Sequence, residues 1–310
     1  MTEPGATQAA PADANRGTWV NRAPAFLQPY LRLSRYDRPA GFWLLGLPCL
    51  IGLAFARLDA VFQPGDSLLA ALFVIGAVAM RGAGCTYNDI LDKDIDAKVE
   101  RTALRPLPSG AVTTKQAWAW LLLQCLVGLA VLLALPRFAQ YVALGSIPMV
   151  ALYPLMKRIT WWPQVWLGLT FNWGVLVAAA ATQGAVTQAD IVLYAALIFW
   201  TLGYDTIYAL QDREDDALIG VKSTARRFGG QVKPAVSVIY AVCAVLAGVA
   251  GWMAAGAAGV FGVLLFAVHL ALQAVRLAPD NGARALGLFR ANRDAGVLLF
   301  AGWAFIAAFI

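Results

Sequence analysis

Acidic and amide side chains follow one another at helical spacing in the stretch CTYNDILDKDIDAKVERT. Asn88, Asp92 and Asp96 are four residues apart, so in a helix they share one face. Carboxylates at this spacing lie about 6 Å apart, and at an effective dielectric of about 20 they repel by about 3 kcal/mol. A cation has to offset that repulsion. Because Mg²⁺ binds carboxylates together with phosphate oxygens and waters, the spacing predicts a magnesium site that takes a phosphorylated ligand.

A second acidic stretch, YDTIYALQDREDDALIGVKSTARR, lies in the other half of the chain. Asp205, Asp212 and Asp216 repeat the offsets of seven and four residues that lead from Arg81 to Asp92. Both stretches continue into Gly, Ser or Thr with basic residues. A solvated loop with ion pairs would explain one stretch alone. The repeat favours two acid-rich faces that form one Mg²⁺-diphosphate clamp, with Lys and Arg side chains meeting the remaining phosphate charge.

Membrane helices must position these stretches. The chain is 60% hydrophobic and only 14% charged, whereas soluble domains carry about 25% charged residues. Apolar runs of about 20 residues, the length of a membrane helix, recur along the chain. We predict nine spans, at 40–57, 67–87, 116–135, 138–156, 163–182, 189–210, 234–253, 257–275 and 295–310. Four spans separate the two acidic stretches, so both face the same side of the membrane, as a parallel internal repeat.

Lys and Arg residues divide unevenly between the two sides of that membrane. All except Arg57 and Arg137 fall on the side of the N-terminal tail, and by the positive-inside rule that side is cytoplasmic. We expect a multi-pass protein of a bacterial cell inner membrane with a cytoplasmic N-terminus. Residues 1–23 are expected to be a disordered tail, and 24–310 one transmembrane domain. The net charge of +6 then reports topology, and neither nucleic acid nor an obligate protein partner is inferred.

The residues most often used as metal ligands elsewhere carry no signal of a site. The four cysteines fall in apolar segments without metal-ligand spacing, so we expect small buried hydrophobic residues. The one histidine, His269, lies within a predicted span. We expect it to be a packed, hydrogen-bonded residue and not a catalyst.

The chain resembles the UbiA superfamily of intramembrane prenyltransferases from YDRPAG to NRDAG. The family motif NDxxDxxxD is matched by Asn88, Asp89, Asp92 and Asp96, and the motif DxxxD by Asp212 and Asp216. The stretches MRGAGCTYND, YPLMKR and DDALIGVKSTA look most like members that act on 4-hydroxybenzoate in ubiquinone biosynthesis. One departure is Asn172, where the family is expected to have a small residue. If this position lines the tunnel for the prenyl chain, the preferred chain length is open.

The resemblance implies an all-α fold of nine transmembrane helices around a central cytoplasm-facing cavity, with the two motifs facing each other across it. It implies that residues 24–310 form a transmembrane prenyltransferase domain with Mg²⁺ as cofactor. Its substrates would be polyprenyl diphosphate, drawn from the lipid bilayer, and 4-hydroxybenzoate, prenylated at the ring carbon ortho to the hydroxyl. Metal and bases would neutralise the leaving diphosphate, and the membrane cavity would exclude water from the allylic cation.

Roles for individual residues follow from the same resemblance. The expected metal ligands are Asp92, Asp96, Asp212 and Asp216, with Asn88 beside them. The expected diphosphate contacts are Arg101, Arg105 and Lys157, assisted by Arg158, Lys222 and Arg38. The tyrosines proposed to face the cation are Tyr87, Tyr204 and Tyr208, for which helix packing is the alternative.

Two further residues are expected near the acceptor. Arg81 shares the helix face of Asn88 two turns earlier, and an arginine at that depth is costly unless it meets an anion. We expect it to hold the acceptor carboxylate, with a standing ion pair to Asp205 as the alternative. Asp205 itself resembles a family position close to the acceptor, where it would orient the phenol or accept its proton.

Other functions remain open at this point. Homogentisate, dihydroxynaphthoate, haem or chlorophyllide would be the acceptor in other branches of the superfamily. A cation or proton transporter also keeps carboxylates in membrane helices, but it would place them at midspan and would not need a ring of Arg and Lys. Prenyl chain length and oligomeric state are not predicted.

Overall fold

The computed structural model describes residues 17–97, 100–213, 217 and 220–309, without the side chains of residues 100, 101 and 212. Within these ranges the regular structure is entirely helical. The chain divides into two units: unit 1 comprises Met1–Gly41 and Val78–Leu129, and unit 2 comprises Phe42–Ala77 and Ala130–Ile310. The divisions fall inside three helices, α2 (Ala40–Phe55), α3 (Asp66–Asp96) and α5 (Thr114–Ala134).

Unit 1 contains short helices beside the parts of α3 and α5 that belong to it. These are η1 (Trp19–Arg22), α1 (Gln28–Leu33) and α4 (Glu100–Ala103). Four fully buried apolar side chains, Leu33, Leu107, Val112 and Ala117, form its core. Because this core includes Leu33, the α1 segment is packed into the unit.

The structure describes residues 17–23 of the predicted tail. Thr18 caps η1 by accepting a hydrogen bond from the backbone amide of Val20 at 3.0 Å, and Val20 is fully buried. Burial of an apolar side chain next to a capped turn explains this local order. Residues 1–16, the rest of the predicted tail, lie outside the described residues.

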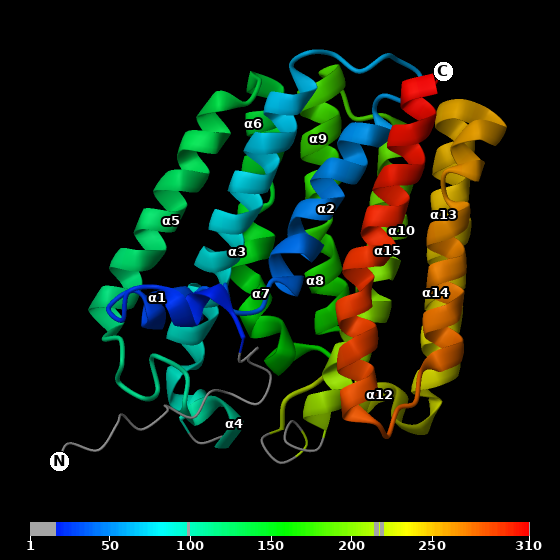
Figure 1. Ribbon diagram of the computed structural model, residues 1–310. Coiled ribbons are helices and arrows are strands. Elements are labelled where there is room, and N and C mark those ends of the chain that lie inside the picture. Colours follow the sequence, from blue (N-terminus) through cyan, green and yellow to red (C-terminus); the bar gives the residue numbers. More distant parts are fainter. Residues whose placement is uncertain (1–16, 98–99, 214–216, 218–219, 310) are drawn as a thin grey trace. The chain divides into compact units, whose positions relative to one another are not determined.

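Unit 2 is built around α10, which packs against α8, α13 and α15, while α13 packs on α14 and α14 on α15 (Figure 1). Its helices are α2 (Ala40–Phe55), α6 (Arg137–Leu144), α7 (Ile147–Ile159), α8 (Pro163–Phe171), α9 (Trp173–Gln183), α10 (Gln188–Tyr208), η2 (Ala209–Asp212), α12 (Thr224–Phe228), η3 (Gly229–Gln231), α13 (Val232–Phe261), α14 (Leu264–Arg276) and α15 (Gly282–Phe309). The largest buried side chains of its core include Trp200, Phe266 and Trp303.

Each predicted span coincides with a helix or with two consecutive helices. In the described part of the chain, six are long and apolar enough to cross a membrane: Asp66–Asp96, Thr114–Ala134, Arg137–Ile159, Pro163–Gln183, Gln188–Gln211 and Thr224–Phe261. Ala40–Phe55 and Leu264–Arg276 are apolar but shorter. Large apolar side chains such as Leu122, Leu126 and Leu133 are exposed along α5, as a lipid environment requires. The count of nine spans stays a prediction.

Glycine makes the chain reversal between the seventh and eighth predicted spans. α13 is kinked at Ala255 and Gly256, where Gly256 has φ 57°, a left-handed conformation that favours glycine. The two arms of this turn touch through Gly251 and Gly259. A Cβ on Gly251 would lie 2.5 Å from the Gly259 carbonyl oxygen, so only glycine permits the close approach.

A chain of buried polar side chains ties the helices of unit 2 together. Asn292 on α15 accepts from Trp200 Nε1 at 2.8 Å and donates to Gln273 Oε1 at 2.9 Å. Gln273 also accepts from Tyr240 and bonds His269 Nδ1 at 3.0 Å. The interpretation of His269 as a hydrogen-bonded packing residue is confirmed. All four cysteines are free; Cys85 and Cys243 are buried as expected, whereas Cys49 and Cys125 are partly buried.

We expect Asn292→Ala to destabilise the protein by about 2–4 kcal/mol. The substitution leaves the Trp200 indole N–H and the Gln273 amide oxygen buried with one hydrogen-bond partner fewer. The measurement is the apparent melting temperature of the detergent-solubilised protein. Ser237→Ala is the matched control, because that exposed hydroxyl bonds only its own helix at the Lys233 carbonyl. Equal melting temperatures for Asn292→Ala and the control would show that the network contributes nothing.

Candidate active site

The first acidic motif lies entirely on α3. The helix continues beyond the predicted end of the span at residue 87 as far as Asp96, so Asn88, Asp92 and Asp96 share one face as their spacing predicts. Asn88 Nδ2 donates to Asp92 Oδ2 at 3.0 Å. Asp92 is 1% exposed and Asp96 7% exposed. Water therefore does little to screen the repulsion between these carboxylates, and cations have to offset it.

Arg105 supplies one such cation. Thr102 on α4 donates to the backbone carbonyl of Asp96 at 2.7 Å, which ties α4 to the end of α3. Arg105 then reaches back, with Nη1 2.6 Å from Asp96 Oδ2 and 3.5 Å from Asp89 Oδ1. A residue predicted to contact diphosphate is thus held against the acidic face. The side chain of Arg101, its predicted partner, lies outside the described residues.

Arg35 is a second cation at this face, and the sequence interpretation missed it. Its Nη2 lies 2.7 Å from Asp89 Oδ1, and its Nη1 donates to the Arg32 carbonyl at 3.2 Å. Burial alone lowers the pKa of Arg35, but the adjacent Asp89 carboxylate outweighs burial and raises that pKa above its ordinary value, so the group stays charged. The available signal was an arginine next to the YDRPAG stretch, which spacing alone does not link to Asp89.

Arg81 packs against the backbone of the YDRPAG stretch. It is half-buried on α3, two turns before Asn88. A Cβ on Gly41 would lie 2.6 Å from Arg81 Nε and 2.8 Å from Arg81 Nη2. A side chain at position 41 would therefore displace the guanidinium from this position. Arg38, a predicted secondary diphosphate contact in the same stretch, pairs with Asp37 at 3.3 Å.

The second acidic motif differs from the first in its backbone. α10 ends at Tyr208 and continues as the 3₁₀-helix η2 to Asp212, whereas α3 is an α-helix throughout its motif. The offset of seven from Asp205 therefore does not follow one α-helical face. Asp205 is half-buried in the last turn of α10. The side chain of Asp212 and the whole of Asp216 lie outside the described residues.

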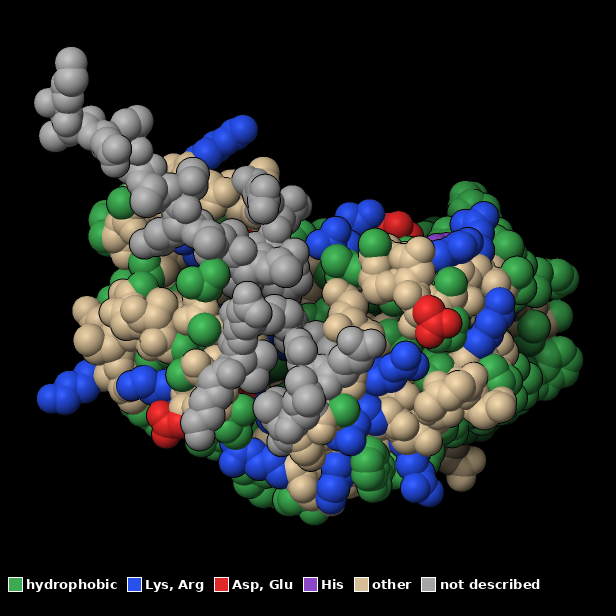
Figure 2. Space-filling view, turned by 90° about the horizontal axis from the view of Figure 1, so that it is seen from below, with side chains coloured by type: hydrophobic (Ala, Val, Ile, Leu, Met, Phe, Trp, Pro, Cys, Tyr) green, Lys and Arg blue, Asp and Glu red, His purple; other side chains and the backbone are tan. Residues whose placement is uncertain are grey.

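Backbone hydrogen bonds bring predicted basic residues together at the end of α7. The Lys222 amide donates to the Lys157 carbonyl at 3.0 Å, and Lys222 Nζ donates to the Ile159 carbonyl at 3.1 Å. Thr206 and Thr224 share a buried hydrogen bond of 2.6 Å, which fixes the same loop to α10. Lys and Arg side chains predominate over acidic ones on the face seen in Figure 2. Lys157 is half-buried and Arg158 is exposed.

The tyrosines proposed to face the cation are packed among other rings. Tyr204 is 1% exposed, and its ring centroid lies 5.4 Å from that of Trp200. The ring centroid of Tyr208 lies 4.5 Å from that of Phe289, and the ring centroid of Tyr87 lies 6.5 Å from that of Trp118. The burial of Tyr204 against Trp200 agrees with the alternative role in helix packing. The proposed role of the three rings in stabilising the cation stays a prediction.

Asn172 is fully buried at the junction of α8 and α9. Its Nδ2 lies 2.7 Å from Thr201 Oγ1 and 2.9 Å from the Leu197 carbonyl, both on α10. The side chain thus fastens the break between α8 and α9 to the central helix of unit 2. Its burial gives it a structural role there, which the sequence did not indicate.

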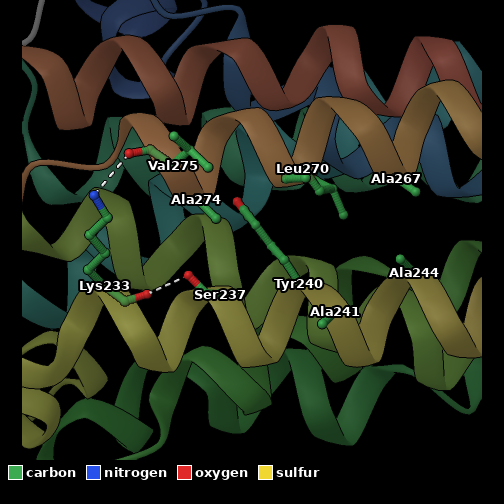
Figure 3. Close-up of a pocket in the computed structure, with 10 residues that line it drawn as sticks. Lys233, Ser237, Tyr240, Ala241, Ala244, Ala267, Leu270, Ala274 and Val275 are labelled. Carbon is green, nitrogen blue, oxygen red and sulfur yellow. Dashed lines mark hydrogen bonds between the residues drawn. The ribbon is translucent and has the colours of Figure 1, made fainter.

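Unit 2 contains a groove. It has a volume of about 410 Å³, runs between α13 and α14 and is lined mainly by alanines (Figure 3). Lys233 at one end donates to the Val275 carbonyl at 2.9 Å. None of the residues that line the groove is a predicted site residue.

Comparison with known proteins decides the family. A model of the UbiA prenyltransferase family matches residues 45–308. The chain belongs to the UbiA prenyltransferase family. It is 43% identical over 287 residues to the mitochondrial 4-hydroxybenzoate polyprenyltransferase of Homo sapiens, which covers 91% of this chain and 76% of the human protein. It is 45% identical over 282 residues to the Drosophila melanogaster enzyme of the same name, covering 89% and 70% of the two chains.

Solved structures show the UbiA fold. The apo structure of a UbiA homologue from Aeropyrum pernix K1 superposes with a TM-score of 0.70 at 28% identity, covering 84% of this chain and 96% of the other. A UbiA homologue from Archaeoglobus fulgidus, described as bound to GPP and Mg²⁺, superposes with a TM-score of 0.66 at 19% identity, covering 91% and 100%. The prediction of an all-α membrane fold is confirmed, while the helix count and the cavity stay predictions.

The expected location in a bacterial inner membrane is contradicted. The relatives just described, and those from Rattus norvegicus and Arabidopsis thaliana, are mitochondrial enzymes of eukaryotes. The physical reason for the error is that an asymmetry of Lys and Arg reports which loops stay on the insertion side. It contains no information on which membrane, or which organism, the UbiA protein occupies.

The unit 1 residues fit a magnesium ion in this UbiA chain. The possible metal ligands on the acidic face are carboxylate and amide oxygens, which a hard cation prefers. The carboxylates are too buried for water to screen their charge. Within the residues the structure describes, no three metal-binding side chains of the His, Cys, Asp and Glu types form a group. The side chain of Asp212 and the whole of Asp216 lie outside that description.

Proposed function

We propose that this prenyltransferase transfers a polyprenyl group from polyprenyl diphosphate to the ring carbon of 4-hydroxybenzoate that lies ortho to the hydroxyl, with Mg²⁺, as a step of ubiquinone biosynthesis. The observation that carries the proposal is the 43% identity, over 91% of the chain, to an enzyme named for this reaction. The oxygen-rich acidic face and the adjacent guanidiniums support it chemically.

Asn88, Asp92 and Asp96 would hold Mg²⁺ from α3, with Asp212 and Asp216 as the opposite ligands. The metal would supply charge neutralisation of the leaving diphosphate. The neighbour from Archaeoglobus fulgidus, described with GPP and Mg²⁺, supports a divalent metal and an allylic diphosphate. The residues that would contact phosphate oxygens are Arg101, Arg105 and Lys157, with Arg158, Lys222 and Arg38 adding positive charge.

The reaction exchanges one bond for another. The C–O bond between the prenyl group and diphosphate breaks, diphosphate leaves with the electron pair, and the allylic carbon becomes cationic. The acceptor ring attacks it through the carbon beside the hydroxyl, a C–C bond forms, and that carbon loses its proton. Arg81 would hold the acceptor carboxylate in a bidentate contact. Asp205 would orient the phenol or accept the proton.

Both acidic motifs should face the same side of the membrane, because the Lys and Arg asymmetry and the four predicted spans between them require it. We expect cysteines introduced at Lys93 and Arg213, in a background without the four native cysteines, to react with a membrane-impermeant thiol reagent from one side only. A cysteine at Arg137, one of the two basic residues on the other side, is the control. Labelling of the two motif sites from opposite sides would overturn the arrangement.

A comparison of acceptors tests the substrate. Membranes containing the protein are given Mg²⁺, a polyprenyl diphosphate and labelled 4-hydroxybenzoate, homogentisate or dihydroxynaphthoate in parallel. We expect prenylated 4-hydroxybenzoate to dominate. Product from another acceptor alone would assign the chain to a different branch of the family. Ion transport in proteoliposomes without prenyl diphosphate, together with no prenylated product, would support a transporter instead.

A further inference from the structure

Three of the four acidic or amide positions in the first motif share one helix face, but Asp89 is offset from Asn88 by one residue. Asp89 is fully buried, and two guanidiniums lie against its Oδ1, those of Arg35 at 2.7 Å and Arg105 at 3.5 Å. Its ion-pair partners are therefore two arginines of the same unit. The other motif carboxylate beside Arg105 is Asp96, at 2.6 Å.

The residue that binds Asp89 most closely has an unusual backbone. Arg35 has φ 60° and, in the described chain, no other non-glycine residue has a positive φ. Such a conformation persists only where the surroundings enforce it. Arg35 Nη1 donates to the carbonyls of Arg32 and Leu33 at the end of α1, while Nη2 binds Asp89. The strained residue thus links the short helix α1 to the motif helix α3.

Arg105 contacts two carboxylates, and a bound metal ion would affect only one of them directly. Asp96 is a proposed metal ligand, so a bound cation would compete with Arg105 for it. Asp89, already paired with Arg35, would keep its attraction for Arg105 during that exchange. The guanidinium could then turn toward a phosphate group without leaving the site.

We infer that Asp89 is a positioning residue and not a magnesium ligand: with Arg35 it anchors Arg105 at the acidic face, so that Arg105 is retained for diphosphate when metal takes Asp96. This role rests on the proposed function. It assigns to one motif position a task different from that of its neighbours, and it makes the α1 segment part of the support of the diphosphate site.

Stability tests the anchor without any turnover. Removing one partner of a buried ion pair is strongly destabilising, so Asp89→Asn and Arg35→Asn should each lower the apparent melting temperature by about 5–10 °C. Asparagine tolerates the backbone conformation of Arg35. The melting temperature of the double variant should be no lower than that of the less stable single variant, because both substitutions remove the same ion pair. Additive losses would overturn the anchor.

Ligand binding tests the positioning role, with magnesium and inorganic pyrophosphate as probes and thermal stabilisation as the readout. In Asp92→Asn the magnesium concentration for half stabilisation should rise at least about tenfold. In Asp89→Asn the magnesium concentration for half stabilisation should stay within about twofold of the wild-type value. The pyrophosphate concentration for half stabilisation at saturating magnesium should rise about tenfold. Asp94→Asn, an exposed carboxylate on the same helix, is the matched control and should change neither.

A third variant separates positioning from a general structural effect. If Asp89 acts through Arg105, its substitution should have no further effect on pyrophosphate binding in an Arg105→Ala background. A magnesium requirement in Asp89→Asn that rises as it does in Asp92→Asn would identify Asp89 as a ligand and overturn the inference. If magnesium pyrophosphate does not stabilise even the wild-type protein, the proposed function is overturned as well. That outcome is distinguishable from the failure of the inference alone, in which the wild type is stabilised.

Discussion

Asp92→Ala is expected to lower prenyl transfer by about 100-fold or more while the protein remains folded and inserted. Asp92 is 1% exposed and accepts from Asn88 on the acidic face of α3. Without it, the proposed metal loses a ligand at the position where the leaving diphosphate has to be neutralised. The measurement is the initial rate with saturating prenyl diphosphate and 4-hydroxybenzoate, alongside size-exclusion chromatography in detergent.

Metal removal should have the same effect on the unmodified protein. EDTA is expected to abolish turnover, and added Mg²⁺ should restore it in the wild type but only at higher concentration in an Asp92→Asn variant. Asp94→Ala, which removes an exposed carboxylate from the same helix, should retain full activity. Turnover that survives EDTA would contradict a magnesium site at this face.

Arg81→Ala is expected to raise the KM for 4-hydroxybenzoate about ten- to a hundredfold while changing the KM for prenyl diphosphate little. The loss of a hydrogen bond to a charged group is worth about 1.5–3 kcal/mol, which corresponds to that range. Arg81→Lys should restore affinity only in part, because lysine keeps the charge but not the two-pronged contact. The measurement is steady-state kinetics with each substrate varied in turn.

The packing of Arg81 provides a second way to perturb it. Gly41→Ala would place a Cβ within 2.6 Å of Arg81 Nε. Since the guanidinium is the far end of a flexible side chain, it can move aside at little cost in stability. Gly41→Ala should therefore also raise the KM for 4-hydroxybenzoate, by less than Arg81→Ala. Gly84→Ala, where a Cβ meets nothing within 4 Å, is the control. Equal impairment for both substrates in Arg81→Ala would contradict the assignment.

Helical periodicity was enough to predict the first motif. The spacing of Asn88, Asp92 and Asp96 placed them on one face, and α3 confirms that face because nothing in its sequence interrupts the helix. The same reasoning was weaker for Asp212, because η2 interrupts the α-helix at residue 209. No turn residue in the sequence marks that change, so the repeat of offsets did not reveal it.

Contacts between residues distant in sequence were beyond the reach of spacing arguments. The pairing of Arg35 with Asp89 depends on how α1 packs on α3, and the close packing at Gly41 depends on the path of the Arg81 side chain. The buried bonds of Asn172 to α10 are of the same kind. Each arises from tertiary packing, which a single sequence does not state.

The most direct test of the central claim is to identify the product made by the purified protein. With Mg²⁺, a polyprenyl diphosphate and 4-hydroxybenzoate, we expect one pyrophosphate to be released for each molecule of product. Mass spectrometry and NMR should show the prenyl group bonded to the ring carbon beside the hydroxyl, with the carboxylate intact. Pyrophosphate release without a new carbon–carbon bond, or a prenyl group attached to an oxygen of the acceptor, would contradict the account.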